Sequence, residues 1–432
     1  MRKFLRKQPP SRIIAVGFFL TILLGSALLM LPCSIQDGVT LRYIDSLYTS
    51  TSAVCVTGLI AVDAGDTFTV FGQIILAFLI QIGGLGVTAI GAGVILAMGK
   101  KVNFKGRTLV QESMSLSSGK GITPFLRNVF ATTVMFELAG AFLSFFVFVK
   151  DYPPLRAAGI SLFHSIAAFN SSGFDILGNF QSLIPYQDNV ALNLLTCGLV
   201  FFGGIGFLVI RELWEKKCRF KKLSMHARVV LSVSIILLAL GTVLIKATED
   251  ISWLGAFFSS VSARTAGFST FSLGKFSQTG LLTITILMFI GASPGSTGGG
   301  IKTSTVFALL QGVKTAATNK TGKAFHYSLP KEAFHKASII TLLAACVIFL
   351  GTFLLSVFEP NIPLNELLFE ATSAFGTVGL STGITPSLTD NSKLLSIAIM
   401  FIGRLGPLTI ATLWYFGREE RVRYPEGNLA IG

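Results

Sequence analysis

Long apolar runs alternate with polar connections along the whole chain of 432 residues. These runs are close to the ~20 residues that a helix needs to cross a bilayer. They begin near Ile13, Phe71, Val129, Val190, Val229, Gly280, Ile339 and Leu394. The pattern predicts eight membrane-spanning helices. The first run lacks a small-residue cleavage site after it, so we expect it to remain as a span and not to be removed as a signal peptide.

A shorter apolar segment, of about ten residues, lies between the two spans of each successive pair. The four segments read "YIDSLYTSTSAV", "GISLFHSIAAF", "ISWLGAFFSSVS" and "LNELLFEATSAF". Each is too short to cross a bilayer, which favours a half-helix that enters the membrane and ends inside it.

Each short segment runs directly into small residues that end in a glycine and an apolar residue. These stretches read "AVCVTGL", "AFNSSGF", "SARTAGF" and "AFGTVGL", with glycines at Gly58, Gly173, Gly267 and Gly379. The spans that follow also repeat a motif: "IGGLG" at 82–86, "FGGIG" at 202–206 and "IGRLG" at 402–406. The chain therefore divides into four repeats, 1–110, 111–222, 223–325 and 326–417, with a tail at 418–432.

Repeated non-helical glycine segments at membrane depth indicate an ion pathway. Such backbone is tolerated only where protein buries it or where it lines a watery cavity. Four such segments around one axis can turn their carbonyl oxygens inward and replace the hydration shell of a cation, and glycine permits the backbone angles that this requires. Close helix packing is the alternative use of such glycines, but it does not account for four half-helices.

Composition and charge support a membrane protein and argue against a nucleic-acid partner. Only 13% of the residues are charged and the mean hydropathy is +0.70, whereas soluble domains have roughly 25% charged residues. The net charge of +14 comes mostly from alternate connections, at 1–12, 100–127, 211–228, 314–336 and 418–432. Because basic connections face the cytoplasm, this alternation predicts that both termini are cytoplasmic.

The third repeat departs from the other three. Where they have a short glycine motif, it has "GASPGSTGGGIK", which should interrupt the helix over 291–300. We expect a flexible loop on the cytoplasmic side of the glycine segments that obstructs the pathway, although a static kink would also fit. Its proposed working residues are Gly291, Pro294, Gly295, Gly298, Gly299, Gly300, Lys302 and Arg404.

Arg404 lies inside an apolar run, at the position of Gly84 and Gly204 in the first two repeats. A charge inside the membrane usually marks function, and an arginine has five donors and no acceptor. We therefore expect Arg404 to bind carbonyl groups of the loop, or of the C-terminal end of the interrupted helix, and to hold the loop closed; a purely structural anchor would also fit. Lys302 could act in the same way or reach toward the cytoplasmic surface. Arg264 should point behind its glycine segment, where an acidic neighbour could pair with it, and Glu137 is either a coupling site or an interhelical contact.

Enzymatic chemistry has little support in the sequence. An enzyme would need a nucleophile beside a base, or a metal cluster. The five cysteines and four histidines are not spaced as metal ligands, and no nucleotide-binding motif is present. We predict no enzyme activity and no cofactor or metal in this chain beyond a transported cation.

The quoted segments "TSAVCVTGL", "FNSSGF", "SARTAGF", "SAFGTVGL" and "FIGRLGP" resemble the Trk/Ktr/HKT potassium transporter superfamily, with the bacterial KtrB-type membrane subunit as the nearest type. The resemblance covers essentially the whole chain. It implies an all-α integral membrane protein with eight transmembrane helices, built as four M1–pore helix–M2 repeats arranged pseudo-fourfold around one ion pore.

The resemblance also implies site residues. The selectivity filter would contain Gly58, Gly173, Gly267 and Gly379, one from each repeat. Potassium contacts would come from their neighbours Val56, Thr57, Ser171, Ser172, Thr265, Ala266, Thr377 and Val378. In the superfamily a serine at the first filter position is associated with sodium transport, so Gly58 favours potassium. A sodium-permeable or weakly selective cation channel is the alternative.

Partners and location are implied in the same way. A KtrB-type subunit is expected in the bacterial plasma membrane as a homodimer, on a cytosolic ring of RCK (KtrA-type) subunits. Nucleotide would bind only to that partner, and sodium could be a regulatory ion. Membrane lipids surround the chain, and the tail at 418–432 would lie at the dimer interface.

Overall fold

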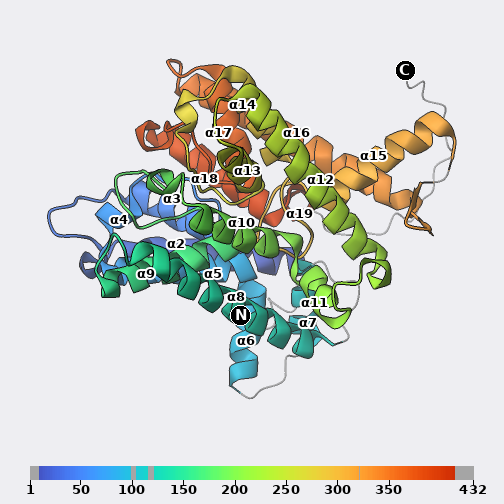
Figure 1. Cartoon of the computed structure of the whole chain (residues 1–432), viewed down its shortest axis with the longest axis horizontal. Coiled ribbons are helices and arrows are strands. Elements are labelled where there is room, and N and C mark those ends of the chain that lie inside the picture. The colour runs from blue at the N-terminus through green and yellow to red at the C-terminus, as the bar shows by residue number, and fades with distance from the viewer. Residues whose placement is uncertain (1–8, 99–103, 115–120, 321, 414–432) are drawn as a thin grey trace.

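The computed structural model describes residues 9–98, 104–114, 121–320 and 322–413, and their regular secondary structure is almost entirely helical (Figure 1). The tail at 418–432 lies outside the described residues. Each of the four repeats contributes a long helix, a short helix and a second long helix, in that order.

The first long helix of every repeat is unbroken. These helices are α2 (Pro10–Leu29), α8 (Ile122–Phe148), α12 (Met225–Thr248) and α16 (Lys331–Phe358). All four are long and apolar enough to cross a membrane, as their runs predicted.

The four predicted short helices are confirmed. They are α3 (Tyr43–Val54), α9 (Pro154–Phe169), α13 (Trp253–Ser262) and α17 (Leu364–Gly376). Proline precedes or opens two of them, at Pro153 and Pro363, where its missing N–H costs the helix nothing. Ser252 caps α13 by accepting the N–H of Gly255. All four end directly before the repeated glycine segments.

The second long helices all begin at a side-chain cap. They are α5 (Val70–Leu85), α10 (Val190–Ile205), α14 (Gln278–Phe289) and α18 (Asp390–Leu405). The caps, each of which accepts a backbone N–H of the first turn, are Thr69, Asn189, Ser277 and Thr389. Such oxygens satisfy donors that the helix itself leaves free.

The second helices are interrupted at the repeated glycine motif, which the sequence analysis did not predict for the first, second and fourth repeats. In three repeats the helix breaks at one glycine and continues in a new direction, as α6 (Val87–Ala97), α11 (Phe207–Glu215) and α19 (Pro407–Thr412). Gly86, Gly206 and Gly406 have φ of 85°, 92° and 88°, angles that other residues rarely adopt. The bends at the first two are 98° and 100°.

These breaks bear on the number of spans. By length and composition, the described residues contain four helices able to cross a membrane, or up to six if each of the two strongly bent pairs is one span. The second long helix of the third repeat stops at Phe289 after 12 residues, and that of the fourth ends at Leu405, directly before Gly406. The predicted total of eight spans therefore stays a prediction.

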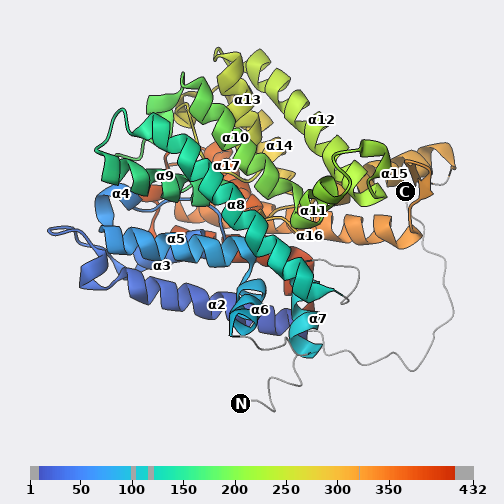
Figure 2. The ribbon, with the colours of Figure 1, turned by 60° about the horizontal axis from the view of Figure 1, so that its bottom comes forward.

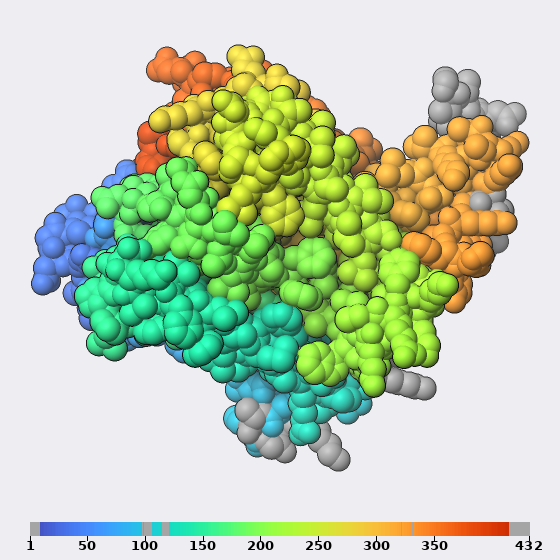
Figure 3. Space-filling view, in the orientation of Figure 1, coloured from blue at the N-terminus to red at the C-terminus, as the bar shows by residue number. Residues whose placement is uncertain are grey.

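The third repeat has a loop where the others have a corner, as predicted. Helix α14 ends at Phe289 and α15 (Thr303–Thr318) begins at Thr303. Beyond it lies the small hairpin of β1 (Lys323–Ala324) and β2 (Tyr327–Ser328). Helix α15 and this hairpin form a protrusion on the right of Figures 1 and 3.

The remaining elements are short connections. They are α4 (Ala64–Thr67), α7 (Phe104–Ser113), and the 3-10 turns η1 (Pro32–Ser34), η2 (Ile184–Tyr186), η3 (Phe220–Lys222), η4 (Leu273–Lys275) and η5 (Thr385–Ser387).

Contacts between repeats follow a closed cycle. Within a repeat the first long helix packs on both the short helix and the second long helix, as Figure 2 shows for α2, α3 and α5. Between repeats the second long helix packs on the next short helix, in the pairs α5–α9, α10–α13, α14–α17 and α18–α3. The last pair joins the end of the chain to its beginning. It contains a buried ion pair, in which Lys393 Nζ lies 2.7 Å from Asp45 Oδ1.

Candidate functional site

The four repeated glycines form a closed ring of neighbours. A Cβ built on Gly58 would lie 2.2 Å from the carbonyl oxygen of Ser172, and one on Gly379 would lie 2.2 Å from that of Thr57. Around the ring, a Cβ on Gly173 would approach Ala266 O to 2.7 Å and one on Gly267 would approach Val378 O to 2.6 Å. Each glycine thus faces the carbonyl group that precedes the glycine of an adjacent repeat, and no side chain fits at any of the four positions.

The backbone of the four segments repeats in detail. All four glycines have positive φ, between 67° and 94°. The residue two positions earlier is also left-handed in every repeat: Val56 (φ 55°), Ser171 (57°), Thr265 (85°) and Thr377 (49°). Left-handed angles are uncommon outside glycine and are real outliers for β-branched residues. Sequence reasoning assigned the unusual angles to glycine alone and missed this second position.

Two serines hold the glycine segments of the first and fourth repeats. The N–H of Gly58 donates to Ser52 Oγ at 3.0 Å, and the N–H of Gly379 donates to Ser373 Oγ at 3.1 Å. The equivalent positions in the second and third repeats are Ala167 and Val261, whose side chains cannot accept a hydrogen bond. Repetition of serine six residues before a glycine was the signal in the sequence that could have identified this support.

The loop over 291–300 is closed at its base and attached to the second repeat. Its ends meet where the N–H of Gly291 donates to Ile301 O at 2.9 Å, and Ser293 Oγ lies 2.9 Å from Thr303 Oγ1. At the corner of the second repeat, the N–H of Phe207 donates to the carbonyl of Gly295 at 3.0 Å. The N–H of Ser293 donates to Gly204 O at 3.0 Å.

The middle of the loop lies directly against the glycine segments. The N–H of Gly299 donates to Thr377 Oγ1 at 3.0 Å. Thr297 Oγ1 donates to Phe169 O at 3.3 Å, at the end of the second short helix. A Cβ on Gly298 would lie 2.4 Å from Thr265 Oγ1. Glycine is needed here because the loop approaches the segments more closely than a side chain allows.

Arg404 binds the loop through carbonyl groups, as expected. Its guanidinium donates to Thr297 O, in the loop, and to Gly83 O, at the end of α5. It also donates to Gly84 O at 3.3 Å. Arg404 therefore connects the fourth repeat, the loop and the first repeat. Its effect on transport stays a prediction.

Lys302 makes a second set of contacts to the loop. Its Nζ donates to Gly298 O at 2.7 Å and to Gly299 O at 3.4 Å. Of the two roles considered for Lys302, the structure favours contact with the loop. A cavity of about 190 Å³ borders this region; its lining includes Lys302, Arg404 and the corner residues Gly86 and Gly406, but none of the four glycine segments.

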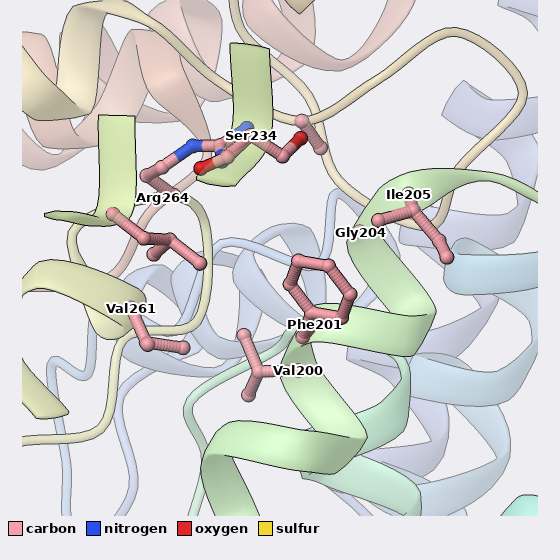
Figure 4. Close-up of a pocket in the computed structure, with 9 residues that line it drawn as sticks. Val200, Phe201, Gly204, Ile205, Ser234, Val261 and Arg264 are labelled. Carbon is pink, nitrogen blue, oxygen red and sulfur yellow. The ribbon is translucent and has the colours of Figure 1, made fainter. Parts of the chain in front are cut away.

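Arg264 lies behind the third glycine segment and faces a small cavity beside Ser234 (Figure 4). It donates to Ser234 O at 3.3 Å and to Gly291 O, at the start of the loop, at 3.4 Å. Among the described residues no carboxylate forms an ion pair with it. The prediction that Arg264 could pair with an acidic neighbour was therefore wrong, because its partners are main-chain carbonyl groups of α12 and the loop.

Glu137 is an interhelical contact. Its Oε1 accepts from Asn170 Nδ2 at 3.0 Å, and the same Nδ2 lies 2.8 Å from Gln81 Oε1. Asn170 lies in the second glycine segment, three residues before Gly173. Glu137 therefore supports that segment from behind, through one amide.

Carboxylates gather beyond the second glycine segment, at the short helix α4 and next to it. Asp63 and Asp66 accept the N–H groups of Phe180 and Asn179, at 2.6 and 2.8 Å. Burial, together with the nearby Asp63 and Asp66 carboxylates, raises the pKa of Asp175 to about 7. Within the described residues, no three His, Cys, Asp or Glu side chains come together as a metal site would require.

The arrangement can bring carbonyl oxygens of four repeats together at one point and close that point from one side with a loop. The short helices direct their C-terminal, negative ends toward the same point, which favours a cation there.

Comparisons with known proteins agree with a cation pathway. The family model described as "TrkH: Cation transport protein" matches residues 10–416. The Ktr system potassium uptake protein B of Bacillus subtilis is 37% identical, over 100% of this chain and 98% of that protein. The potassium/sodium uptake protein NtpJ of Enterococcus hirae is 35% identical, over 100% and 99%.

A solved structure shares the fold. The potassium transporter TrkH from Vibrio parahaemolyticus superimposes with a TM-score of 0.72 at 19% identity, over 94% of this chain and 84% of that chain. The match of the family model to residues 10–416, together with the full-length relatives, shows that the chain belongs to the TrkH family of cation transport proteins.

Proposed function

We propose that this protein takes up potassium across the bacterial plasma membrane through a channel-like pore. The observation that carries the proposal is the closed ring of Gly58, Gly173, Gly267 and Gly379 with their neighbouring carbonyl groups. Carbonyl oxygens held at fixed positions can replace the hydration shell of a potassium ion. The potassium uptake named for the Bacillus subtilis relative supports the same ion.

The pore would run through this ring. Eight spans form four M1–pore helix–M2 repeats with pseudo-fourfold symmetry, and both termini face the cytoplasm. The cyclic contacts α5–α9, α10–α13, α14–α17 and α18–α3 support this arrangement. The filter carbonyls would be those of the eight neighbouring residues, Val56, Thr57, Ser171, Ser172, Thr265, Ala266, Thr377 and Val378.

The loop over 291–300 would be the gate. It lies against three of the four filter segments, and Arg404 and Lys302 hold it by its carbonyl groups. An ion could pass only after the loop moves aside. The guanidinium would also repel a cation beneath the filter until it moves.

Regulation would come from partners. We propose a homodimer on a cytosolic RCK-type ring, with nucleotide bound only by that ring and with no cofactor in this chain. The name of the Bacillus subtilis relative assigns it to a Ktr system, which supports a second subunit. Sodium could act as a regulatory ion.

A sodium-permeable or weakly selective cation transporter is the second candidate, favoured by the potassium/sodium uptake named for NtpJ. The test is uptake of rubidium tracer into liposomes that contain the purified chain, with potassium and then sodium as competitor. Competition by potassium alone is the expected result. Equal competition by sodium would contradict potassium selectivity and favour the second candidate.

A matched pair of glycine substitutions connects this test to the ring. Gly58→Ala should abolish uptake, because its Cβ would overlap Ser172 O. Gly159→Ala, on the short helix α9, meets no atom within 4 Å and should leave uptake unchanged. Equal uptake by the two variants would contradict a pore through the ring.

A further inference from the structure

Three filter segments carry a hydroxyl group at the left-handed position two residues before the glycine. These residues are Ser171, Thr265 and Thr377, and all three are fully buried. The fourth member of the set is Val56, which has no hydroxyl group. The three hydroxyl groups come from three different repeats and face the loop.

Three consecutive loop residues each meet one of these hydroxyl groups. The N–H of Gly299 donates to Thr377 Oγ1 at 3.0 Å. Thr297 Oγ1 lies 3.5 Å from Ser171 Oγ. Gly298 approaches Thr265 Oγ1 so closely that a Cβ would lie 2.4 Å from it. Each of the three loop residues therefore contacts a different hydroxyl group. A loop that only closed a passage would not need this match of one residue to one hydroxyl group.

One of the three hydroxyl groups has no partner. Thr265 Oγ1 is buried and forms no hydrogen bond with any described residue. Leaving a buried polar group unpaired is costly, so its retention here suggests that it is paired in another state. Clustered neutral oxygens are the ligands with which a pore replaces the water of a monovalent cation.

We propose that the hydroxyl groups of Ser171, Thr265 and Thr377 form a monovalent-cation site at the base of the filter, and that the closed loop occupies this site. The ion and the closed loop then exclude one another. The loop directs the N–H donor of Gly299 at an oxygen that the ion would need. This inference rests on the proposed function, because it requires the ions to pass through the ring of glycines.

Because the ion and the closed loop exclude one another, each must weaken the binding of the other. If the closed loop weakens ion binding, an ion at this site must destabilise the closed loop by the same factor. A potassium ion that reaches the base of the filter would therefore favour the open gate. The transported ion would itself take part in gating, before any cytosolic partner acts.

The test is calorimetric titration of potassium into the purified full chain and into a variant that lacks residues 296–299. Removal of this part of the loop uncovers the three hydroxyl groups, so an additional class of potassium sites should appear in the variant. Arg404→Ala serves as a second uncovered variant if the shortened chain does not fold. Absence of additional sites in a folded uncovered protein would overturn the proposal.

Thr265→Val identifies the ligands of the additional site. Thr265 Oγ1 forms no hydrogen bond with the loop, so its loss should leave closure intact and weaken only the additional site, by roughly tenfold. The effect should be seen in the uncovered protein and not in the intact one. If Thr265→Val weakened potassium binding equally in the intact and the uncovered protein, the mutual exclusion of ion and loop would be overturned. If it weakened potassium binding in neither protein, the proposed site would be overturned.

Two further variants complete the design. Val56→Thr adds a fourth hydroxyl group at nearly constant volume and should strengthen the additional site. Thr352→Val removes a buried, unpartnered hydroxyl group of α16 and should change nothing. Failure of the proposed function is distinct, because then no variant would bind potassium saturably or take up rubidium.

Discussion

Four equivalent helices of this protein are interrupted in two different ways. Three turn a corner at one glycine, at Gly86, Gly206 and Gly406, with nearly the same φ and ψ. The fourth, in the third repeat, replaces that corner by the loop over 291–300. The corner needs only the local backbone angle, whereas the loop depends on contacts from the second and fourth repeats and reaches the first repeat only through Arg404.

The corner is a property of a single backbone position, whereas on the proposed function the loop is a removable obstruction. The loop is held by individual hydrogen bonds, several of them from two cationic side chains, and each can be exchanged for water. We therefore expect substitutions in the corners to change stability, and substitutions around the loop to change transport.

Arg404→Ala should have the largest effect on transport. It removes donors to Thr297 O and Gly83 O, and a hydrogen bond from a charged group contributes about 1.5–3 kcal/mol. Rubidium uptake should rise by about tenfold or more. Arg211→Ala, at an exposed ion pair of α11, is the matched control. Unchanged or lower uptake by folded Arg404→Ala would show that this arginine does not hold the gate.

Gly86→Ala tests the prediction that substitutions in the corners change stability and not transport. Its Cβ would meet no atom within 4 Å, so the only cost is a residue held at φ 85° and ψ 135°, about 1–3 kcal/mol. Thermal unfolding in detergent should occur at lower temperature, with uptake per folded molecule unchanged. Gly91→Ala, also free of close contacts, should not lower the unfolding temperature. An increase in uptake by Gly86→Ala would mean that the corners also control the passage of ions.

Gly298→Ala should displace the loop without removing any hydrogen-bond donor. The added Cβ would overlap Thr265 Oγ1, and overpacking of a tight contact typically costs about 1–3 kcal/mol. Part of this cost can be relieved by loop movement, so uptake should increase several-fold, less than for Arg404→Ala. A decrease in uptake would indicate that the methyl group blocks the pore instead.

Ser293→Ala and Thr303→Val should have the smallest effects. Their hydroxyl groups pair across the base of the loop at 2.9 Å, and a neutral hydrogen bond contributes about 0.5–1.5 kcal/mol. Each variant should raise uptake about twofold to threefold. The double variant should add little, because the two residues share one interaction. Fully additive effects would show that the pair does not act as a unit.

Local features of the fold were predictable from the sequence because they depend on local pattern. The segment "YIDSLYTSTSAV" coincides with α3, and the glycine-rich loop interrupts its helix where the composition indicates. The positions of the repeated glycines also followed from alignment of the four repeats. Each of these features is encoded within a few neighbouring residues.

Features that depend on distant neighbours were not predictable. "IGGLG" is compatible with a continuous helix, and only the surrounding packing selects the corner at Gly86. The carbonyl partners of Arg264 come from α12 and the loop, which no pattern around Arg264 indicates. The left-handed angle at Thr377 is imposed from outside, since a threonine would not adopt it alone.

The buried pair of Lys393 and Asp45 has a consequence for synthesis of the chain. The two residues are 348 positions apart, so Asp45 has no Lys393 to pair with until nearly the entire polypeptide has left the ribosome. The ring of repeats closes only at that stage. A partly made chain would therefore contain helices but not the closed ring of repeats. If the ring forms the pore, as proposed, the cell's ion gradients would not be exposed to a half-built pathway.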